Sequence, residues 1–230
     1  MRLRTLGTLT AAIAVSAGLA MSPASAAVTL QPGIRMWSDD LGCTTNFVFD
    51  GTGAQAGKVF LGTAAHCVTG VGRPVTDEDG VVWGTVAHVG NEDATETDYA
   101  FVQVLPGHVG RVYAGVKGYP QFPKGVTNPA QTALGKAVQF SGYGMGFEYT
   151  QPTREKRFGN LTYDDAEIYT TLSAVIFGDS GGPAVYKPTG QALGIVSRLC
   201  IGLCEQEGPT VQGMIAKAGA RGFGVRLRSV

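Results

Sequence analysis

Residues 81–89, VVWGTVAHV, form one of several short runs that are rich in β-branched and aromatic side chains. Similar runs recur at 99–105 (YAFVQVL), 137–141 (AVQFS), 168–172, 183–186 and 192–197 (ALGIVS). Clusters of Gly, Pro, Asn and Asp, which favour turns, separate these runs. Short strands at this spacing are typical of a barrel or a sandwich, so the sequence predicts an all-β protein.

The composition indicates a folded, turn-rich chain. Of the 230 residues, 44% are hydrophobic and 16% are charged, which supplies enough apolar surface for a core and excludes general disorder. The 34 glycines are not arranged in a Gly-X-Y repeat, so a collagen helix is excluded. The 18 basic and 18 acidic side chains give a formal net charge of zero. This balance offers no electrostatic basis for binding nucleic acid or an anionic membrane, and we expect neither as a partner.

A proline-rich segment divides the chain. Residues 119–129, YPQFPKGVTNP, hold three prolines and show no strand period, as is typical of a connector. We therefore expect an N-terminal β-barrel over residues 27–118 and a C-terminal β-barrel over residues 130–230. Only Val211–Ala220, VQGMIAKAGA, has a helical pattern, so we also expect one short helix near the C-terminus.

The first 26 residues have the pattern of a secretory signal peptide. Arg2 and Arg4 give a positive start, residues 6–20 are mainly apolar, and Ala24-Ser25-Ala26 supplies the small residues of a cleavage site. The apolar run is shorter than the roughly 20 residues that a membrane anchor needs. We expect cleavage after Ala26 and a secreted, extracellular protein.

Four cysteines in an exported chain predict two disulfides, which three connectivities could satisfy. Pairing of near neighbours, Cys43 with Cys67 and Cys200 with Cys204, is the most economical choice. The pair at 200 and 204 has no second pair of ligands at zinc spacing, and the acidic clusters do not match an EF-hand. We therefore expect no metal site and no cofactor.

Three motifs hold the residue types that nucleophilic catalysis requires. His66 lies in TAAHC, Asp98 begins DYAF, and Ser180 lies in GDSGGP. A serine hydroxyl is a weak nucleophile near neutral pH, so it needs a base to take its proton and a carboxylate to orient that base. His66 and Asp98 are the candidates for these roles. The glycines around Ser180 allow a sharp turn, in which the N–H groups of Gly178 and Ser180 can converge on a developing oxyanion.

The three motifs, in the order His, Asp, Ser, resemble those of the chymotrypsin-type serine peptidases, specifically of their secreted bacterial branch. The resemblance extends over nearly all of residues 27–230 and implies two six-stranded antiparallel β-barrels with the active site in the cleft between them. His66 and Asp98 would come from the first barrel and Ser180 from the second. We accordingly expect a monomer whose partners are protein or peptide substrates and, as further candidates, protein inhibitors.

The resemblance also assigns residues to substrate binding. It implies that Ser197 supports Asp98, and that the backbone of Ser197, Arg198 and Leu199 pairs with an extended substrate as an added strand. Ala174, six residues before the serine, would form the base of the primary pocket.

These residues do not decide which substrate side chain is preferred before the scissile bond. Because Ala174 is not acidic, it favours an apolar or medium-sized residue there. Glu205 and Glu207 follow Cys204 near the expected pocket wall, and either could restore a preference for basic residues. Ile176 stands where the family usually has a cysteine, so the frame of this pocket differs from the usual one.

The chain departs from the animal enzymes in how it would become active. Those enzymes are switched on by an Ile-Val-Gly-Gly amino terminus that inserts beside the Asp preceding the serine, and this chain has no such sequence. In bacterial relatives an internal arginine pairs with that Asp. We therefore expect Arg154 or Arg157 to hold Asp179, and signal removal alone to give a competent enzyme.

Two functions follow from the motifs. The first is a secreted serine endopeptidase that works through an acyl-enzyme intermediate. The alternative is a catalytically silent binding module, or a zymogen-like form, on the same fold. Complete motifs favour the enzyme.

Overall fold

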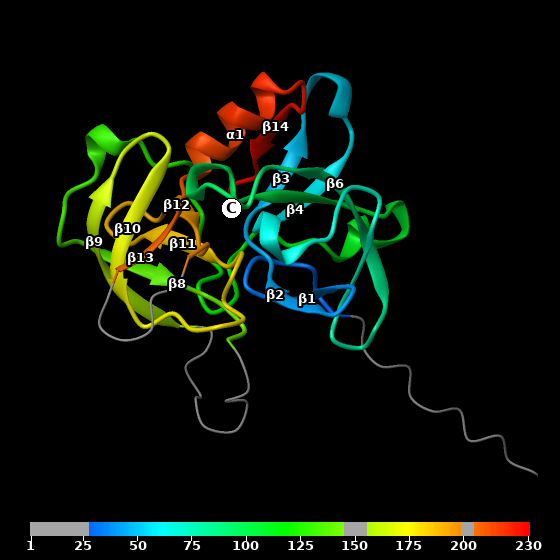
Figure 1. Cartoon of the computed structure of the whole chain (residues 1–230), viewed down its shortest axis with the longest axis horizontal. Coiled ribbons are helices and arrows are strands. Elements are labelled where there is room, and N and C mark those ends of the chain that lie inside the picture. Colours follow the sequence, from blue (N-terminus) through cyan, green and yellow to red (C-terminus); the bar gives the residue numbers. More distant parts are fainter. Residues whose placement is uncertain (1–27, 145–155, 199–204) are drawn as a thin grey trace, which may run out of the picture.

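The computed structural model describes residues 28–144, 156–198 and 205–230. Within these ranges the protein is built mainly of antiparallel strands in two sheets, which occupy opposite sides of the molecule in Figure 1. The expected signal peptide, Arg154, Leu199 and the cysteines at 200 and 204 lie outside the described residues. In the part of the chain that is described, no helix has the length and hydrophobicity needed to cross a membrane.

The first sheet has eight strands in the order β14-β3-β4-β7-β6-β5-β1-β2. They are β1 (Arg35–Ser38), β2 (Leu41–Thr44), β3 (Val48–Gly51), β4 (Val59–Thr63), β5 (Pro74–Thr76), β6 (Val82–Val89), β7 (Ala100–Val104) and β14 (Val225–Leu227). Every residue of β4 is buried, because this strand lies between β3 and β7 near the middle of the apolar core. Its C-terminal end leads directly into the TAAHC motif, so that motif follows a fully buried strand.

The second sheet has six strands in the order β12-β11-β8-β9-β10-β13. They are β8 (Ala137–Phe140), β9 (Arg157–Asp164), β10 (Ile168–Ser173), β11 (Pro183–Tyr186), β12 (Gln191–Ile195) and β13 (Glu205–Pro209). A bridge between Gly194 and Thr210 brings the two edges of this sheet together. The buried hydroxyl of Tyr169 donates a hydrogen bond of 3.1 Å to the carbonyl of Ile195 across the same gap. The sheet therefore curls back on itself.

Helices occupy few of the described residues. The only α-helix among them is α1 (Val211–Ala220), where the sequence predicts it, and the hydroxyl of Thr210 caps it by accepting from the N–H of Gly213 at 3.0 Å. Five short 3-10 helices join strands: η1 (Gly53–Gln55), η2 (Ala65–Cys67), η3 (Thr95–Thr97), η4 (Pro106–Arg111) and η5 (Pro129–Gln131). Two of them, η2 and η3, precede or carry residues of the candidate site.

The all-β class with two antiparallel sheets is confirmed, but the first sheet differs from the expected six strands. It has eight, partly because α1 carries the chain back to the first half of the protein. There Leu227 pairs with Phe49 and Val225 with Gly51, so β14 extends the first sheet beside β3 (Figure 1). Residues 225–227 fall within the range assigned from sequence to the second barrel, yet they belong to the first sheet. The pairing of β14 with β3 joins segments that are distant in the sequence, and no local sequence pattern predicts it.

Two apolar clusters form the core. The larger lies within the first sheet and centres on aromatic side chains such as Phe49 and Phe101, whose rings meet edge to face at 5.0 Å. It also includes Ile195 and Met214, which come from the second half of the chain. The smaller cluster fills the second sheet around Tyr169 and Leu193. Because the larger cluster contains side chains from both halves, apolar packing holds the two sheets in one arrangement and fixes the residues where they meet.

Candidate active site

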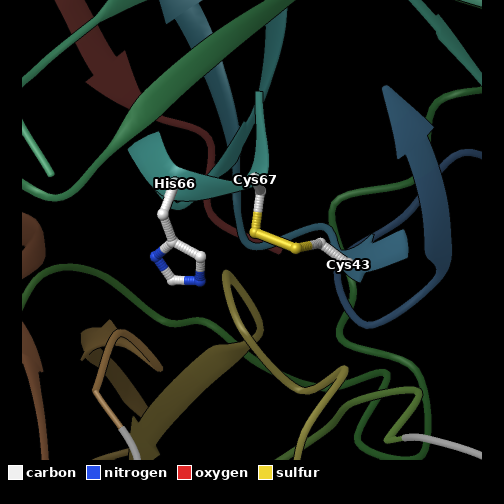
Figure 2. Close-up of side chains that lie close together, drawn as sticks. All are labelled: Cys43, His66 and Cys67. Atoms are coloured by element: carbon white, nitrogen blue, oxygen red, sulfur yellow. A yellow bond between two sulfur atoms is a disulfide. The ribbon is translucent and has the colours of Figure 1, made fainter. Parts of the chain in front are cut away.

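His66 lies in η2, immediately after the buried strand β4. The neighbouring Cys67 forms a disulfide with Cys43 of β2, and Figure 2 shows this bond beside the imidazole of His66. The predicted pairing of these two cysteines is confirmed, whereas the pair at 200 and 204 lies outside the described residues. The disulfide fastens η2 to the β1–β2 hairpin. The imidazole itself remains about one-third exposed, at 34%.

Asp98 follows η3, and its carboxylate faces His66. One oxygen, Oδ2, accepts from Nδ1 of His66 at 2.8 Å, and the other, Oδ1, accepts from the backbone N–H of His66 at 3.0 Å. The hydroxyl of Ser197 also donates to Oδ2. This arrangement places the imidazole proton on Nδ1 and leaves Nε2 with a lone pair that can accept a proton.

The charge on Asp98 is stabilised in this setting. Burial raises the pKa of the carboxyl, but the hydrogen bond and charge of His66, the hydroxyl of Ser197 and the backbone N–H of His66 together lower it further. The net result is a pKa below the ordinary value of 3.8. Asp98 is therefore a buried carboxylate that stays ionised near neutral pH.

Ser180 lies in the loop between β10 and β11, close to the same place. Its carbonyl accepts from the N–H of Thr44 at 2.9 Å and lies 3.7 Å from Sγ of Cys67. The next residue, Gly181, donates to the carbonyl of Val196 at 2.7 Å. These contacts bring Ser180 beside η2, although no hydrogen bond joins its hydroxyl to the imidazole in the described part of the chain. Bonds of this kind often tighten only when substrate binds.

The turn before Ser180 leaves two backbone donors free. Gly178 has a φ of 93°, and its carbonyl accepts from the hydroxyl of Thr44 at 2.7 Å. Among the described residues, no acceptor pairs with the N–H of Gly178 or with that of Ser180. Two unpaired N–H groups in one turn are what an oxyanion site requires.

Gly181 is required by the close approach of the first sheet, and Gly182 by the close approach of Ser141 and Asp179 in the second half of the chain. A Cβ on Gly181 would lie 2.3 Å from Oγ1 of Thr63 and 2.4 Å from the carbonyl oxygen of Thr44, and the φ of 83° also disfavours other residues. A Cβ on Gly182 would lie 2.7 Å from the carbonyl oxygen of Ser141. Glycine thus lets the loop carrying Ser180 pack against the strands beside His66.

Asp179 fixes this turn from inside the second sheet. Its buried carboxylate accepts from the N–H of Gly144 at 2.8 Å and from the N–H of Ile176 at 2.9 Å. The same carboxylate forms an ion pair with Arg157, which is also buried. Of the two arginines expected to hold Asp179, Arg157 is therefore confirmed, while Arg154 lies outside the described residues.

Solved structures provide a comparison for this geometry. A scan with protein-family models finds no match, and a search of curated proteins finds none either. Thermobifida fusca protease A superposes with a TM-score of 0.59 at 19% identity, over 89% of this chain and 100% of the other. The fold is that of chymotrypsin. Cellulomonas bogoriensis chymotrypsin superposes with a TM-score of 0.54 at 21% identity, over 88% of this chain and 99% of the other. Nocardiopsis protease gives 0.59 at 20% identity, over 88% and 100%.

The residues predicted to bind substrate lie at the following positions in the fold. Ala174 is exposed just beyond the end of β10, and Ser197 is buried against Asp98. Arg198 forms an isolated bridge with Glu207 of β13, and its side chain is 47% exposed. Leu199 lies outside the described residues.

The two glutamates considered for the pocket wall differ in their surroundings. Glu205 is exposed on β13. The carboxylate of Glu207 accepts from the hydroxyl of Thr95 at 2.7 Å and lies 3.8 Å from Nη1 of Arg198. Glu207 is therefore already engaged with a hydroxyl of the first half and an arginine of the second.

Two functional contacts were missed from the sequence because their partners are distant along the chain. Thr44 supports both Gly178 and Ser180 from the first sheet, and Thr95 joins η3 to Glu207. No role for either threonine was predicted from the sequence. The only hint is that Thr44 follows Cys43, and a disulfide to Cys67 brings that stretch to η2.

The sulfur atoms near His66 do not make a metal centre. Ligand atoms of Cys43, His66 and Cys67 lie within 4.8 Å of one another. Both sulfurs are joined in the disulfide, so neither is a thiolate that could bind zinc.

Proposed function

We propose that this protein is a secreted serine endopeptidase that hydrolyses peptide bonds through an acyl-enzyme, with His66, Asp98 and Ser180 as its catalytic triad. The observation that carries the proposal is the double hydrogen bond between Asp98 and His66, at 2.8 Å and 3.0 Å, beside the turn that bears Ser180. Solved structures of the same fold that are named as proteases support it. The substrates would be proteins or peptides outside the cell, cleaved by a monomer without a cofactor.

The first half of the reaction forms a covalent bond to the substrate. The hydroxyl oxygen of Ser180 attacks the peptide carbonyl carbon while its proton passes to Nε2 of His66. The carbonyl oxygen becomes an oxyanion, and the free N–H groups of Gly178 and Ser180 are the donors available to it. The tetrahedral intermediate then collapses, and the leaving amine takes the proton from His66. This step leaves an ester between the acyl group and Ser180.

The second half releases the acyl group. Water gives a proton to His66 and attacks the ester carbonyl, and Ser180 leaves with that proton restored. Asp98 keeps its negative charge throughout and stabilises the imidazolium that forms in each half. The pKa of Asp98, held below its ordinary value by the groups around it, is consistent with this role.

Two observations support activation by signal removal alone. The buried pair of Arg157 and Asp179 already occupies the position where a new amino terminus would otherwise be needed. Ile34, near which trimming would occur in a zymogen, is buried, and its carbonyl accepts from the N–H of Thr45 at 2.9 Å. Freeing an amino terminus there would disrupt the first sheet.

Ala174 supports a preference for an apolar or medium-sized residue before the scissile bond, whereas Glu205, exposed on β13, is the carboxylate that would instead favour a basic residue. Ala174 is exposed and carries no charge, and Glu207 is engaged by Thr95 and Arg198. A substrate lysine or arginine would therefore find no free partner in Glu207.

Fluorophosphonate labelling of the secreted, signal-cleaved protein tests the function, with Ser180→Ala and His66→Ala as controls. Labelling of the wild type that is lost in both variants supports the triad, and profiling on a peptide library then gives the preferred residue. A folded wild-type protein that takes no label would contradict the proposal and favour the silent binding module or the zymogen-like form. Recovery of labelling after limited trimming near Ile34 separates those two.

A further inference from the structure

The loop that carries Asp98 is held from the second sheet by more than Ser197. Glu207, on β13, accepts from the hydroxyl of Thr95 at 2.7 Å. Arg198 donates through Nη2 to the carbonyl of Asp93 at 2.9 Å, and its Nη1 lies 3.8 Å from Oε1 of Glu207. We call the three side chains of Thr95, Arg198 and Glu207 the inter-sheet clamp.

The clamp grips the short helix that ends at Asp98. Thr95 begins η3, and the N–H of Asp98 donates to the carbonyl of Thr95 at 3.3 Å. The short helix η3 and Asp98 therefore form one turn, and a shift at Thr95 moves the backbone of Asp98. The contacts from His66 and Ser197 orient the carboxylate, whereas the clamp fixes the backbone from which it projects.

Burial and charge strengthen the contact between Thr95 and Glu207 relative to a surface contact. Thr95 is 7% exposed, and the Glu207 side chain is 33% exposed. A hydrogen bond to a charged group in such a shielded position is about twice as strong as a neutral one. Arg198 supplies the opposite charge, with its Nη1 3.8 Å from Oε1 of Glu207.

We propose that Glu207, with Arg198, is a positioning residue that holds Thr95 and thereby sets Asp98 against the imidazole of His66; this rests on the proposed function. The side chain of Glu207 contacts Thr95 and Arg198, and among the described residues no hydrogen bond joins it to His66, Asp98 or Ser180. Its loss changes the alignment of the triad, which acts on the chemical step rather than on binding. The consequence is a fall in kcat with little change in KM.

Two pairs of variants test the clamp through kinetics. Glu207→Ala is compared with Glu167→Ala, which removes an exposed carboxylate that pairs with Lys217 at 3.0 Å in the second half of the chain. Thr95→Val removes the hydroxyl, and Thr95→Ser restores it. We expect kcat to fall about tenfold in Glu207→Ala and Thr95→Val, as loss of one hydrogen bond to a charged group would give, with KM within about twofold. Glu167→Ala and Thr95→Ser should stay near the wild-type kcat.

The proton between His66 and Asp98 gives a second readout that needs no turnover. In a Ser180→Ala background, its ¹H NMR resonance should shift or broaden in Glu207→Ala and remain in place in Glu167→Ala. A merely structural contact would lower the unfolding midpoint and leave this resonance unchanged. If Glu207→Ala does not fold, Glu207→Gln, which keeps an oxygen acceptor but loses the charge, takes its place.

Distinct outcomes would overturn the clamp and the proposed function. An unchanged kcat and an unchanged imidazole proton in folded Glu207→Ala would overturn the clamp. So would a rise in KM confined to substrates with a basic residue before the scissile bond, because that result would put Glu207 in the pocket. Failure of the wild type to cleave peptides or take label would instead overturn the proposed function, while the NMR comparison would still decide on the clamp.

Discussion

The buried ion pair between Arg157 and Asp179 should contribute to both stability and activity. The substitution Arg157→Met tests this contribution. The substitution keeps much of the side-chain volume but removes the charge. Asp179 would retain only the N–H groups of Gly144 and Ile176, at 2.8 Å and 2.9 Å, to offset a buried negative charge. We expect a large loss of stability together with a disordered oxyanion turn.

The magnitude follows from the burial of both partners. Removing one partner of a buried ion pair costs about 3–5 kcal/mol, against a total unfolding free energy of about 5–15 kcal/mol. In urea the unfolding midpoint should fall by about 1–2 M with an unchanged slope. Because the turn positions two oxyanion donors, labelling of Ser180 by a fluorophosphonate should slow by about 100-fold at a temperature where the variant remains folded.

A double-mutant cycle decides whether the cost arises from the pair. Asp179→Asn and the double variant complete the cycle. If the uncompensated charge is responsible, the double variant loses less stability than the sum of the two single variants, by at least about 1 kcal/mol. Additive losses, or an Arg157→Met variant as stable as the wild type, would refute the reasoning.

Three further predictions concern other parts of the chain. Cys67→Ser opens the loop of 24 residues closed by the bond to Cys43 and should cost about 3 kcal/mol in urea unfolding, whereas a reductant should destabilise only the wild type to the same level. Burial raises the pKa of Asp164 to about 6, so stability falls as pH rises from about 3.8 to about 6. Asp164→Asn should therefore have a free energy of unfolding about 1 kcal/mol higher than the wild type at pH 7, once solvent screening is allowed for, and a higher thermal midpoint. Thermal scans below pH 3.8 should show no such gain. Gly181→Ala places a Cβ 2.4 Å from the carbonyl oxygen of Thr44 and should lower the thermal midpoint and abolish labelling of Ser180; a fully labelled variant would contradict the close packing.

The strands that could be predicted from sequence are those with a strong local pattern. The run at 81–89 became β6 (Val82–Val89), and the run at 99–105 became β7 (Ala100–Val104), because each alternates or is continuously apolar over several residues. The strands β1, β2 and β14 have three or four residues each and were not predicted. Such short segments become strands only through the partners they meet in the folded chain.

The candidate site shows the same division. The motifs around His66, Asp98 and Ser180 could be found because each is short and has characteristic neighbours. The groups that hold them in place, Thr44 and Thr95, act through contacts that span 134 and 112 residues of sequence. Such contacts depend on how the two sheets pack together, and that packing cannot be inferred from local patterns in a single sequence.

The return of the chain at β14 has a consequence for how the protein is made. The edge of β3 stays open until residues 225–227 have been synthesised, since among the described residues only they pair with it on that side, and Arg228 then forms an ion pair with Asp50. Contacts between such distant segments slow folding, and an open strand edge invites pairing with other chains. Residues 27–118 expressed alone would lack this strand and should aggregate. A tag or truncation after Phe223 would therefore disturb the first sheet, which belongs to the half of the molecule that holds His66.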